Sequence, residues 1–220
     1  MKPANEVLSG FGTTVFEVMS RLAIEHDTIN LGQGFPDEGG PESLMRVADE
    51  ATRQQSNQYP PMMGIPELRQ AIAAHNRRFH ALDCDWQAEV MVTSGATEGL
   101  AASLLALLNP GDEVVVFEPL YDSYLPMIRR AGAIARLVRL APPDWALPLD
   151  ELAAAFSEKT KLILLNTPMN PTGKVFSAEE LGSIAELVLR HDAYAILDEV
   201  YEHLIFDGAR HIPLITLPGM

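Results

Sequence analysis

Two polar blocks in this chain carry residue types that could hold a heteroaromatic ring by its edge. An Asn-Pro-Thr-Gly block at residues 170–173 follows the apolar run 162–165, and an Asp-Glu-Val-Tyr block at 198–201 follows the apolar run 194–197. An amide and a phenol can hydrogen-bond a ring hydroxyl, and a carboxylate can hold a ring nitrogen. The spacing therefore presents an amide at one strand end and an acid at the next.

Asp198 is the sharpest of these candidates. A carboxylate at the end of a buried apolar strand is costly to desolvate unless it meets a cation or hydrogen-bond donors. A protonated ring nitrogen would supply that cation. The competing interpretation of Asp198 is a helix N-cap or a loop ion pair, which needs no ligand.

The elements that must position these blocks begin near residue 89, where short apolar runs alternate with helical segments. Strands are expected at 90–93, 113–117, 134–140, 161–166 and 194–198. Helices are expected at 97–108, 121–131, 149–156 and 177–190, and Ser177 with Glu180 has the capping-box spacing. The alternation predicts an α/β fold, with a mainly parallel sheet covered by helices on both faces. Ligands of such sheets bind beyond the carboxyl ends of the strands.

The residues before this region show helical segments and a Gly/Pro-rich stretch instead of alternating strands and helices. Helices are expected at 14–23, at 42–54 with Pro41 at its start, and at 66–79, and a Gly/Pro-rich stretch occupies 31–36. We divide the chain into an amino-terminal segment, 1–58, and a larger domain, 59–220.

Composition excludes several classes of protein. The net charge of −14 argues against nucleic acid or an anionic membrane as a partner. The single cysteine, Cys84, fits a reducing compartment, and we see neither a signal peptide nor an apolar run long enough to span a bilayer, so a cytoplasmic protein is expected. His75 and His80 are five residues apart, on different helix faces, and no metal site is expected.

Two further turns could contact a ligand. The small residues at 93–99 would let the N–H groups of a helix start converge on an anion, although this segment taken alone is better explained by a tight turn capped by Thr97. Tyr121, after the run 113–117, could offer an aromatic face to a flat ring or could pack on the core. The chain has no Gly-x-x-x-x-Gly-Lys pattern, which disfavours a P-loop nucleotide site.

Taken in order, these motifs resemble those of the class I/II pyridoxal-phosphate (PLP) aminotransferases. The resemblance implies that Asp198 pairs with the pyridine nitrogen, while Asn170 and Tyr201 hydrogen-bond the 3-oxygen of the ring. The stretches 31–36 and 117–124 look most like the kynurenine, glutamine and methionine aminotransferase branch.

The same resemblance assigns roles to five other residues. It places the PLP phosphate at Ala96 and Thr97 and stacks the ring on Tyr121. It brings the Gly34 backbone to the substrate carboxylate, which makes 31–36 a substrate-side loop. It also implies that Tyr59 reaches the PLP phosphate of a neighbouring subunit, so that the active protein is a homodimer.

One family feature has no counterpart here. In the family, a lysine after the aspartate carries the cofactor's aldehyde, but the lysines of this chain, Lys2, Lys159, Lys161 and Lys174, all precede Asp198. No catalytic residue is therefore assigned. The chain looks like the amino-terminal part of the family's large domain, lacking the carboxyl-terminal part. Two missing strands would leave a gap in the sheet between 194–198 and 90–93.

The resulting prediction is PLP-dependent transfer of an amino group between an amino acid and a 2-oxo acid, by a chain that is not competent alone. Two alternatives stay open. The first is a PLP-dependent beta-lyase or synthase of the same fold, which the residues present do not separate from a transferase. The second is a non-catalytic PLP-fold binding module, such as the effector domain of a transcription regulator. The amino donor is not determined by these residues.

Overall fold

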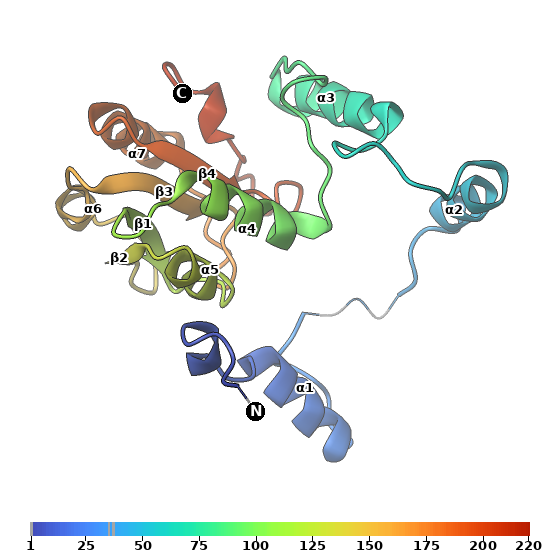
Figure 1. The fold of residues 1–220 in the computed structure, drawn as a ribbon, viewed down its shortest axis with the longest axis horizontal. Coiled ribbons are helices and arrows are strands. Elements are labelled where there is room, and N and C mark those ends of the chain that lie inside the picture. Colours follow the sequence, from blue (N-terminus) through green and yellow to red (C-terminus); the bar gives the residue numbers. More distant parts are fainter. Residues whose placement is uncertain (1, 35, 37) are drawn as a thin grey trace. The chain divides into compact units, whose positions relative to one another are not determined.

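The computed structural model describes residues 2–34, 36 and 38–220. By contacts the chain divides into two compact units, one of Met1–Gly10 with Pro66–Met220 and one of Phe11–Ile65 (Figure 1). We expected a functional boundary between residues 58 and 59, and that boundary stays a prediction.

The larger unit is built on a four-stranded parallel sheet with the strand order β2-β1-β3-β4 (Figure 1). The strands are β1 (Glu113–Glu118), β2 (Ile134–Arg139), β3 (Thr160–Asn166) and β4 (Tyr194–Asp198). The predicted α/β class and parallel sheet are thus confirmed. β1 and β3 are both buried along almost their whole length, because each lies between two other strands and is covered on both faces.

Helices cover the two faces of this sheet in two groups. The helices of this unit are α3 (Pro66–His80), α4 (Gly95–Leu107), α5 (Tyr124–Arg130), α6 (Leu149–Ala155) and α7 (Ala178–Arg190), with short 3-10 turns at Leu8–Gly10 and Leu214–Thr216. Successive side chains of a strand point to opposite faces. Accordingly Leu162 and Leu164 pack with α4 and α5, whereas Ile163 and Leu165 pack with α6 and α7.

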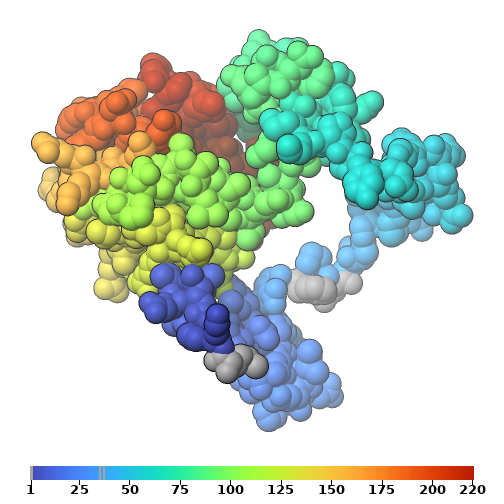
Figure 2. All heavy atoms as spheres, in the orientation of Figure 1, coloured from blue at the N-terminus to red at the C-terminus, as the bar shows by residue number. Residues whose placement is uncertain are grey.

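A local signal explains where α7 begins. The predicted capping box of α7 is present, because Ser177 accepts from the backbone N–H of Glu180 and the Glu180 carboxylate accepts from that of Ser177. In Figure 2 the atoms from α4 onward, coloured light green to red, form one closely packed mass. This packing positions the ends of β3 and β4 firmly.

One predicted strand is absent. Residues 90–93 are not in a strand, and the Val90 carbonyl instead accepts a hydrogen bond of 2.8 Å from Nε of Arg69, which is buried on α3. A strand needs a neighbouring strand to complete its backbone hydrogen bonds. Among the described residues β4 pairs with β3 alone, so nothing stands between β4 and residues 90–93 to supply that partner.

The smaller unit contains α1 (Val15–Glu25) and α2 (Glu42–Gln54), and the predicted bounds of α2 are confirmed. Thr14 caps α1 by accepting from the backbone N–H of Glu17. Neither helix has a buried residue. None of the helices in the described residues of either unit has the length and apolar content needed to cross a membrane.

Candidate functional site

The residues predicted to bind a cofactor in the larger unit meet around one pocket of about 240 Å³. All six predicted residues line it, namely Ala96, Thr97, Tyr121, Asn170, Asp198 and Tyr201. Four residues that were not assigned to the cofactor line it as well, namely Leu100, Tyr124, Asn166 and Val200. The volume of a typical ligand pocket in a protein is about 300 Å³ or more. This pocket therefore suits a small molecule better than a dinucleotide.

Sheet register brings the two polar blocks together. β3 and β4 are parallel and pair Asn166 with Asp198 at their carboxyl ends. The Asn166 side chain donates to the Asp198 carbonyl at 2.8 Å and accepts from the Asn170 backbone N–H at 2.7 Å. Asn166 thus ties both blocks to one strand end, a role that the sequence analysis did not identify. The sequence feature that could have revealed this role is the position of Asn166, a polar residue directly after the apolar run 162–165.

Asp198 is held in the wall of the pocket by a tyrosine. Asp198 is only 8% exposed, and its Oδ2 atom accepts a hydrogen bond of 2.7 Å from the Tyr124 hydroxyl. Burial, together with the nearby Asp198 carboxylate, raises the pKa of Tyr124 far above its ordinary value. The phenol therefore stays protonated and donates. Tyr124 was not among the predicted site residues, although it lies three residues after Tyr121, close enough for both to reach one site.

The start of α4 forms the opposite wall. The helix begins at Gly95, whose φ of +72° favours glycine, and Ser94 makes no side-chain cap. The alternative interpretation of Thr97 as the cap is therefore wrong, because Thr97 lies inside the first turn. The first N–H groups of a helix have no partner within it and attract anions. Ala96 and Thr97, in this first turn, line the pocket.

Three other side chains complete the lining. The ring of Tyr121 meets that of Tyr124 edge to face, with centroids 5.7 Å apart, and Tyr121 precedes α5 instead of opening it as predicted. The peptide bond between Asn170 and Pro171 is cis. Within the described part of the chain, the side chains of Asn170 and Tyr201 make no hydrogen bond. Both are thus available to a ligand.

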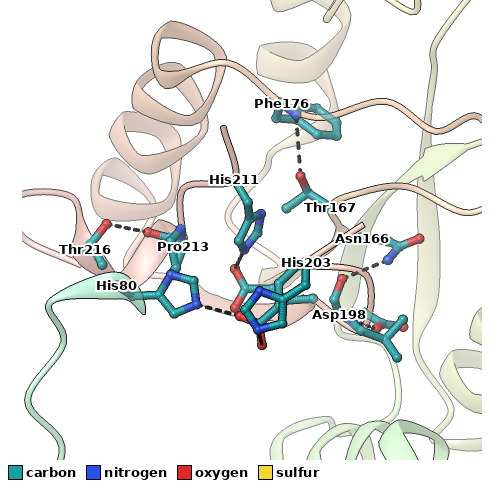
Figure 3. A network of polar contacts seen from close by, with 12 residues as sticks. His80, Asn166, Thr167, Phe176, Asp198, His203, His211, Pro213 and Thr216 are labelled. Carbon is teal, nitrogen blue, oxygen red and sulfur yellow. Dashed lines mark hydrogen bonds and ion pairs between the residues drawn. The ribbon is translucent and has the colours of Figure 1, made fainter. Parts of the chain in front are cut away.

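A partly buried carboxylate meets a buried histidine in the segment after β4. Oε1 of Glu199 lies 3.1 Å from Nε2 of His211, and the His211 side chain, labelled in Figure 3, is almost fully buried. Glu199 belongs to the Asp-Glu-Val-Tyr block at 198–201, but no role was predicted for it. Its contact is twelve residues away along the chain, so the pair closes a loop that carries Tyr201.

The two remaining predicted residues, Gly34 and Tyr59, belong to the smaller unit, and their roles stay predictions. Gly34 has open space where a side chain would begin, and Tyr59 is 97% exposed. Phe35, part of the stretch 31–36, lies outside the described residues.

The donor set of the pocket suits a flat pyridine ring with an anionic tail. A carboxylate lies at one wall, an amide and a phenol are available beside it, an aromatic ring can cover one face, and helix N–H groups lie at the other wall. No lysine is among the residues that line the pocket. Nζ of Lys174 is paired with Oε1 of Glu180 at 2.7 Å instead.

Proteins with similar sequences are named as aminotransferases or transaminases. The chain is 48% identical over 215 residues to the probable N-succinyldiaminopimelate aminotransferase of Mycobacterium tuberculosis, covering 97% of this chain and 54% of that protein. It is 41% identical to the methionine aminotransferase of Escherichia coli, covering 97% and 55%. Kynurenine–oxoglutarate transaminase 3 of mouse is 38% identical, with 97% and 49% covered.

Solved structures agree. The N-succinyldiaminopimelate aminotransferase structure from M. tuberculosis matches with a TM-score of 0.95 at 47% identity, covering 99% of this chain and 57% of that one. The aspartate aminotransferase of Thermus thermophilus with maleate matches with a TM-score of 0.89 at 33% identity, covering 97% and 57%.

The predicted resemblance is confirmed, including that to methionine and kynurenine aminotransferases, while the N-succinyldiaminopimelate relative was not foreseen. The chain spans about half the length of the curated relatives it matches. The family model for aminotransferase class I and II matches residues 26–218. The chain therefore belongs to the class I and II aminotransferases.

Proposed function

We propose that this chain forms the PLP-binding part of an aminotransferase that moves an amino group between an amino acid and a 2-oxo acid. Family membership and the donor set of the pocket support the proposal. Bound PLP supplies an electron sink for the bonds at the amino acid's alpha carbon. The residues of this chain bind and orient that group.

Asp198 carries the proposal. Its buried carboxylate would hold the proton on the pyridine nitrogen, which requires that the carboxylate itself stay ionised and fixed. The 2.7 Å hydrogen bond from Tyr124 and the backbone contact from Asn166 fix it in place. We therefore assign Tyr124 and Asn166 as positioning residues and Asp198 as the cofactor contact.

The other contacts follow from the walls of the pocket. Asn170 and Tyr201 are free to hydrogen-bond the ring oxygen, and Tyr121 can lie against the ring. The N–H groups of Ala96 and Thr97 would receive the phosphate, since the start of a helix favours an anion.

The substitution Asp198→Asn tests this assignment in a full-length polypeptide that carries the chain. Leaving a buried charge without its partner costs about 3–5 kcal/mol, which corresponds to roughly 10²–10⁴-fold in affinity. We expect PLP retention, measured by absorbance after dialysis, and amino transfer to fall by such factors. Asp144→Asn, at an exposed residue, is the matched control. Equal retention in both variants would refute the proposal.

We further propose that the active protein is a cytoplasmic homodimer in which Tyr59 contacts the PLP phosphate of the neighbouring subunit. The exposure of Tyr59 supports a contact outside its own unit. Tyr59→Phe should lower PLP affinity while leaving the sedimentation coefficient that of a dimer. Tyr194→Phe serves as its control, because Tyr194 is an exposed tyrosine on β4. A monomeric active protein would end this part of the proposal.

Gly34 is proposed to bring its backbone to the substrate carboxylate. A methyl group at residue 34 meets no atom within 4 Å in this structure. Gly34→Ala should therefore leave the fold intact, and a raised KM for the amino donor would show the close approach. An unchanged KM would contradict it.

The amino donor is sought among compounds like those named for the relatives. We propose a test with N-succinyldiaminopimelate, methionine and kynurenine, each with a 2-oxo acid acceptor. Formation of the new amino acid indicates transfer. Release of ammonia without it would indicate elimination, the alternative reaction of the same fold.

A further inference from the structure

A second polar cluster lies where α3 approaches the segment that follows β4. His75 and His80 come from α3, and Glu202 and His203 come from the turn after Asp198. Figure 3 shows His80, His203 and His211 gathered in this region. No residue of this cluster lines the PLP pocket described above. The cluster is therefore a separate feature of the larger unit.

One glutamate joins two histidines of this cluster. From their spacing, His75 and His80 were expected on different faces of their helix. In the structure, the two oxygens of Glu202 reach both rings, at 3.5 Å for Nε2 of His75 and 2.6 Å for Nε2 of His80. The bridging residue comes from more than a hundred positions later in the chain, so a local spacing rule could not reveal it.

Three ligand atoms of the cluster have the separations that a metal ion requires. Nε2 of His75 lies 2.9 Å from Nε2 of His203, and Oε1 of Glu202 lies 3.5 Å from the first and 3.7 Å from the second. A circle through the corners of a triangle with these sides has a radius of about 2.0 Å, which matches zinc–nitrogen and zinc–oxygen bonds of 2.0–2.2 Å. A cation just off the plane would be in bonding distance of all three atoms.

We propose that His75, Glu202 and His203 bind a divalent transition-metal ion, with Zn²⁺ as the expected occupant. Two imidazoles and one carboxylate suit zinc and leave a fourth position for water. The side chains are partly open to solvent, with 31%, 25% and 53% of their surfaces exposed, so an ion can enter. Within the described residues, these three form a group whose ligand atoms all lie within 4.8 Å of one another.

Neighbouring groups orient the three ligands. Nε2 of His80 lies 2.6 Å from Oε2 of Glu202, which leaves Oε1 for the metal. Nδ1 of His75 lies 3.4 Å from Oδ1 of Asn76, and a hydrogen bond donated there leaves Nε2 with its lone pair. Such outer hydrogen bonds are a regular feature of metal-binding histidines. His80 and Asn76 are thus positioning residues for the site.

The close approach of the two imidazoles has one competing explanation. Two ring nitrogens 2.9 Å apart need a proton or a cation between them, since two lone pairs would repel. A shared proton gives a simple hydrogen bond. The metal differs in recruiting the Glu202 carboxylate as a third ligand, and it would fasten α3 to the segment that carries Tyr201.

Metal titration separates these explanations. The full-length protein, freed of any affinity tag and stripped with a chelator, would be titrated with ZnCl₂ against a chromophoric indicator. We expect one equivalent of Zn²⁺ to bind and to raise the melting temperature. His203→Ala should weaken binding at least tenfold and abolish the thermal shift, whereas His26→Ala, which removes an exposed histidine of the smaller unit, should leave both unchanged.

Two further variants sharpen the test. Glu202→Gln removes the charged ligand and should weaken binding as His203→Ala does, while a mere hydrogen bond between histidines predicts no dependence on Glu202. His80→Ala should weaken binding about tenfold through the orientation of Glu202. PLP retention should persist in His203→Ala, so failure of this proposal is distinguishable from failure of the PLP site. Absence of stoichiometric Zn²⁺ binding, or binding equal in all variants, would overturn the proposal.

Discussion

The strand β3 and the helices of residues 11–65 show two different ways in which this sequence forms structure. β3 is buried on both faces, and its side chains alternate between two apolar clusters. α1 is capped by Thr14, and α1 and α2 each carry an i,i+4 ion pair, but neither helix has a buried residue. Local signals are thus sufficient to place a helix, whereas the pocket depends on burial and register, which local signals do not determine.

The largest expected difference in stability is between shortening a core side chain of the larger unit and shortening an exposed side chain of the smaller unit. Ile163→Ala in β3 removes a fully buried side chain and should lower the free energy of unfolding by about 2–5 kcal/mol. Leu44→Ala in α2, where the residue is 64% exposed, should change it by no more than about 0.5 kcal/mol. Urea unfolding followed by circular dichroism measures both. Equal costs would show that Leu44 is buried in solution, for example in the proposed dimer.

The next effect concerns the hydrogen bond within the pocket. Tyr124→Phe leaves Oδ2 of the buried Asp198 without its donor and should cost about 1–3 kcal/mol of stability. Tyr121→Phe is the matched control, because the Tyr121 hydroxyl makes no hydrogen bond within the described residues. The two variants can be compared by urea titration. A smaller loss for Tyr124→Phe than for Tyr121→Phe would contradict the positioning role.

Helix caps should differ according to what the helix packs against. Ser177→Ala removes the cap of α7, which contributes to the core, and should lower the melting temperature through a loss of about 1 kcal/mol. Thr14→Ala removes the corresponding cap of α1. Because α1 has no buried residue, we expect that variant to leave the main thermal transition in place. Differential scanning calorimetry distinguishes the two outcomes.

The smallest effect is a pH dependence at the start of α7. Burial raises the pKa of the Glu180 carboxyl, but hydrogen bonds from Lys174, Ser177 and Leu147 lower it below its ordinary value of 4.5. A lowered pKa in the folded state contributes stability above the unfolded value, and that stability is lost as the pH falls through the folded value.

The variant Glu180→Gln isolates this contribution. The stability advantage of the unmodified protein over this variant should be full at neutral pH and should shrink as the pH drops below 4.5. Urea unfolding across that range gives the difference. Glu179→Gln, at the neighbouring residue of the same helix turn, controls for the loss of one negative charge, and a parallel decline in both would argue against the Lys174 pair.

Much of the fold could be predicted because residues close together in the sequence determine many helix and strand boundaries. The apolar runs predicted β4 as the structure has it, and α2, predicted with Pro41 at its start, has the expected bounds. Ser177 and Glu180 predicted their capping box because its two hydrogen bonds span only three residues. The strand expected at 90–93 failed for the opposite reason, since an apolar run becomes a strand only beside a partner.

The sequence by itself determined the order of the chemical groups, from the helix start at Ala96 to Asp198 and Tyr201, and through them the aminotransferase family. Only the tertiary structure decided that Tyr124 donates to Asp198, that Asn166 joins the two blocks, and that Glu202 meets His75 and His80. Each of these contacts joins residues brought together by strand register or by packing of distant segments. Such contacts depend on the burial of apolar faces in three dimensions, which no spacing along the chain records.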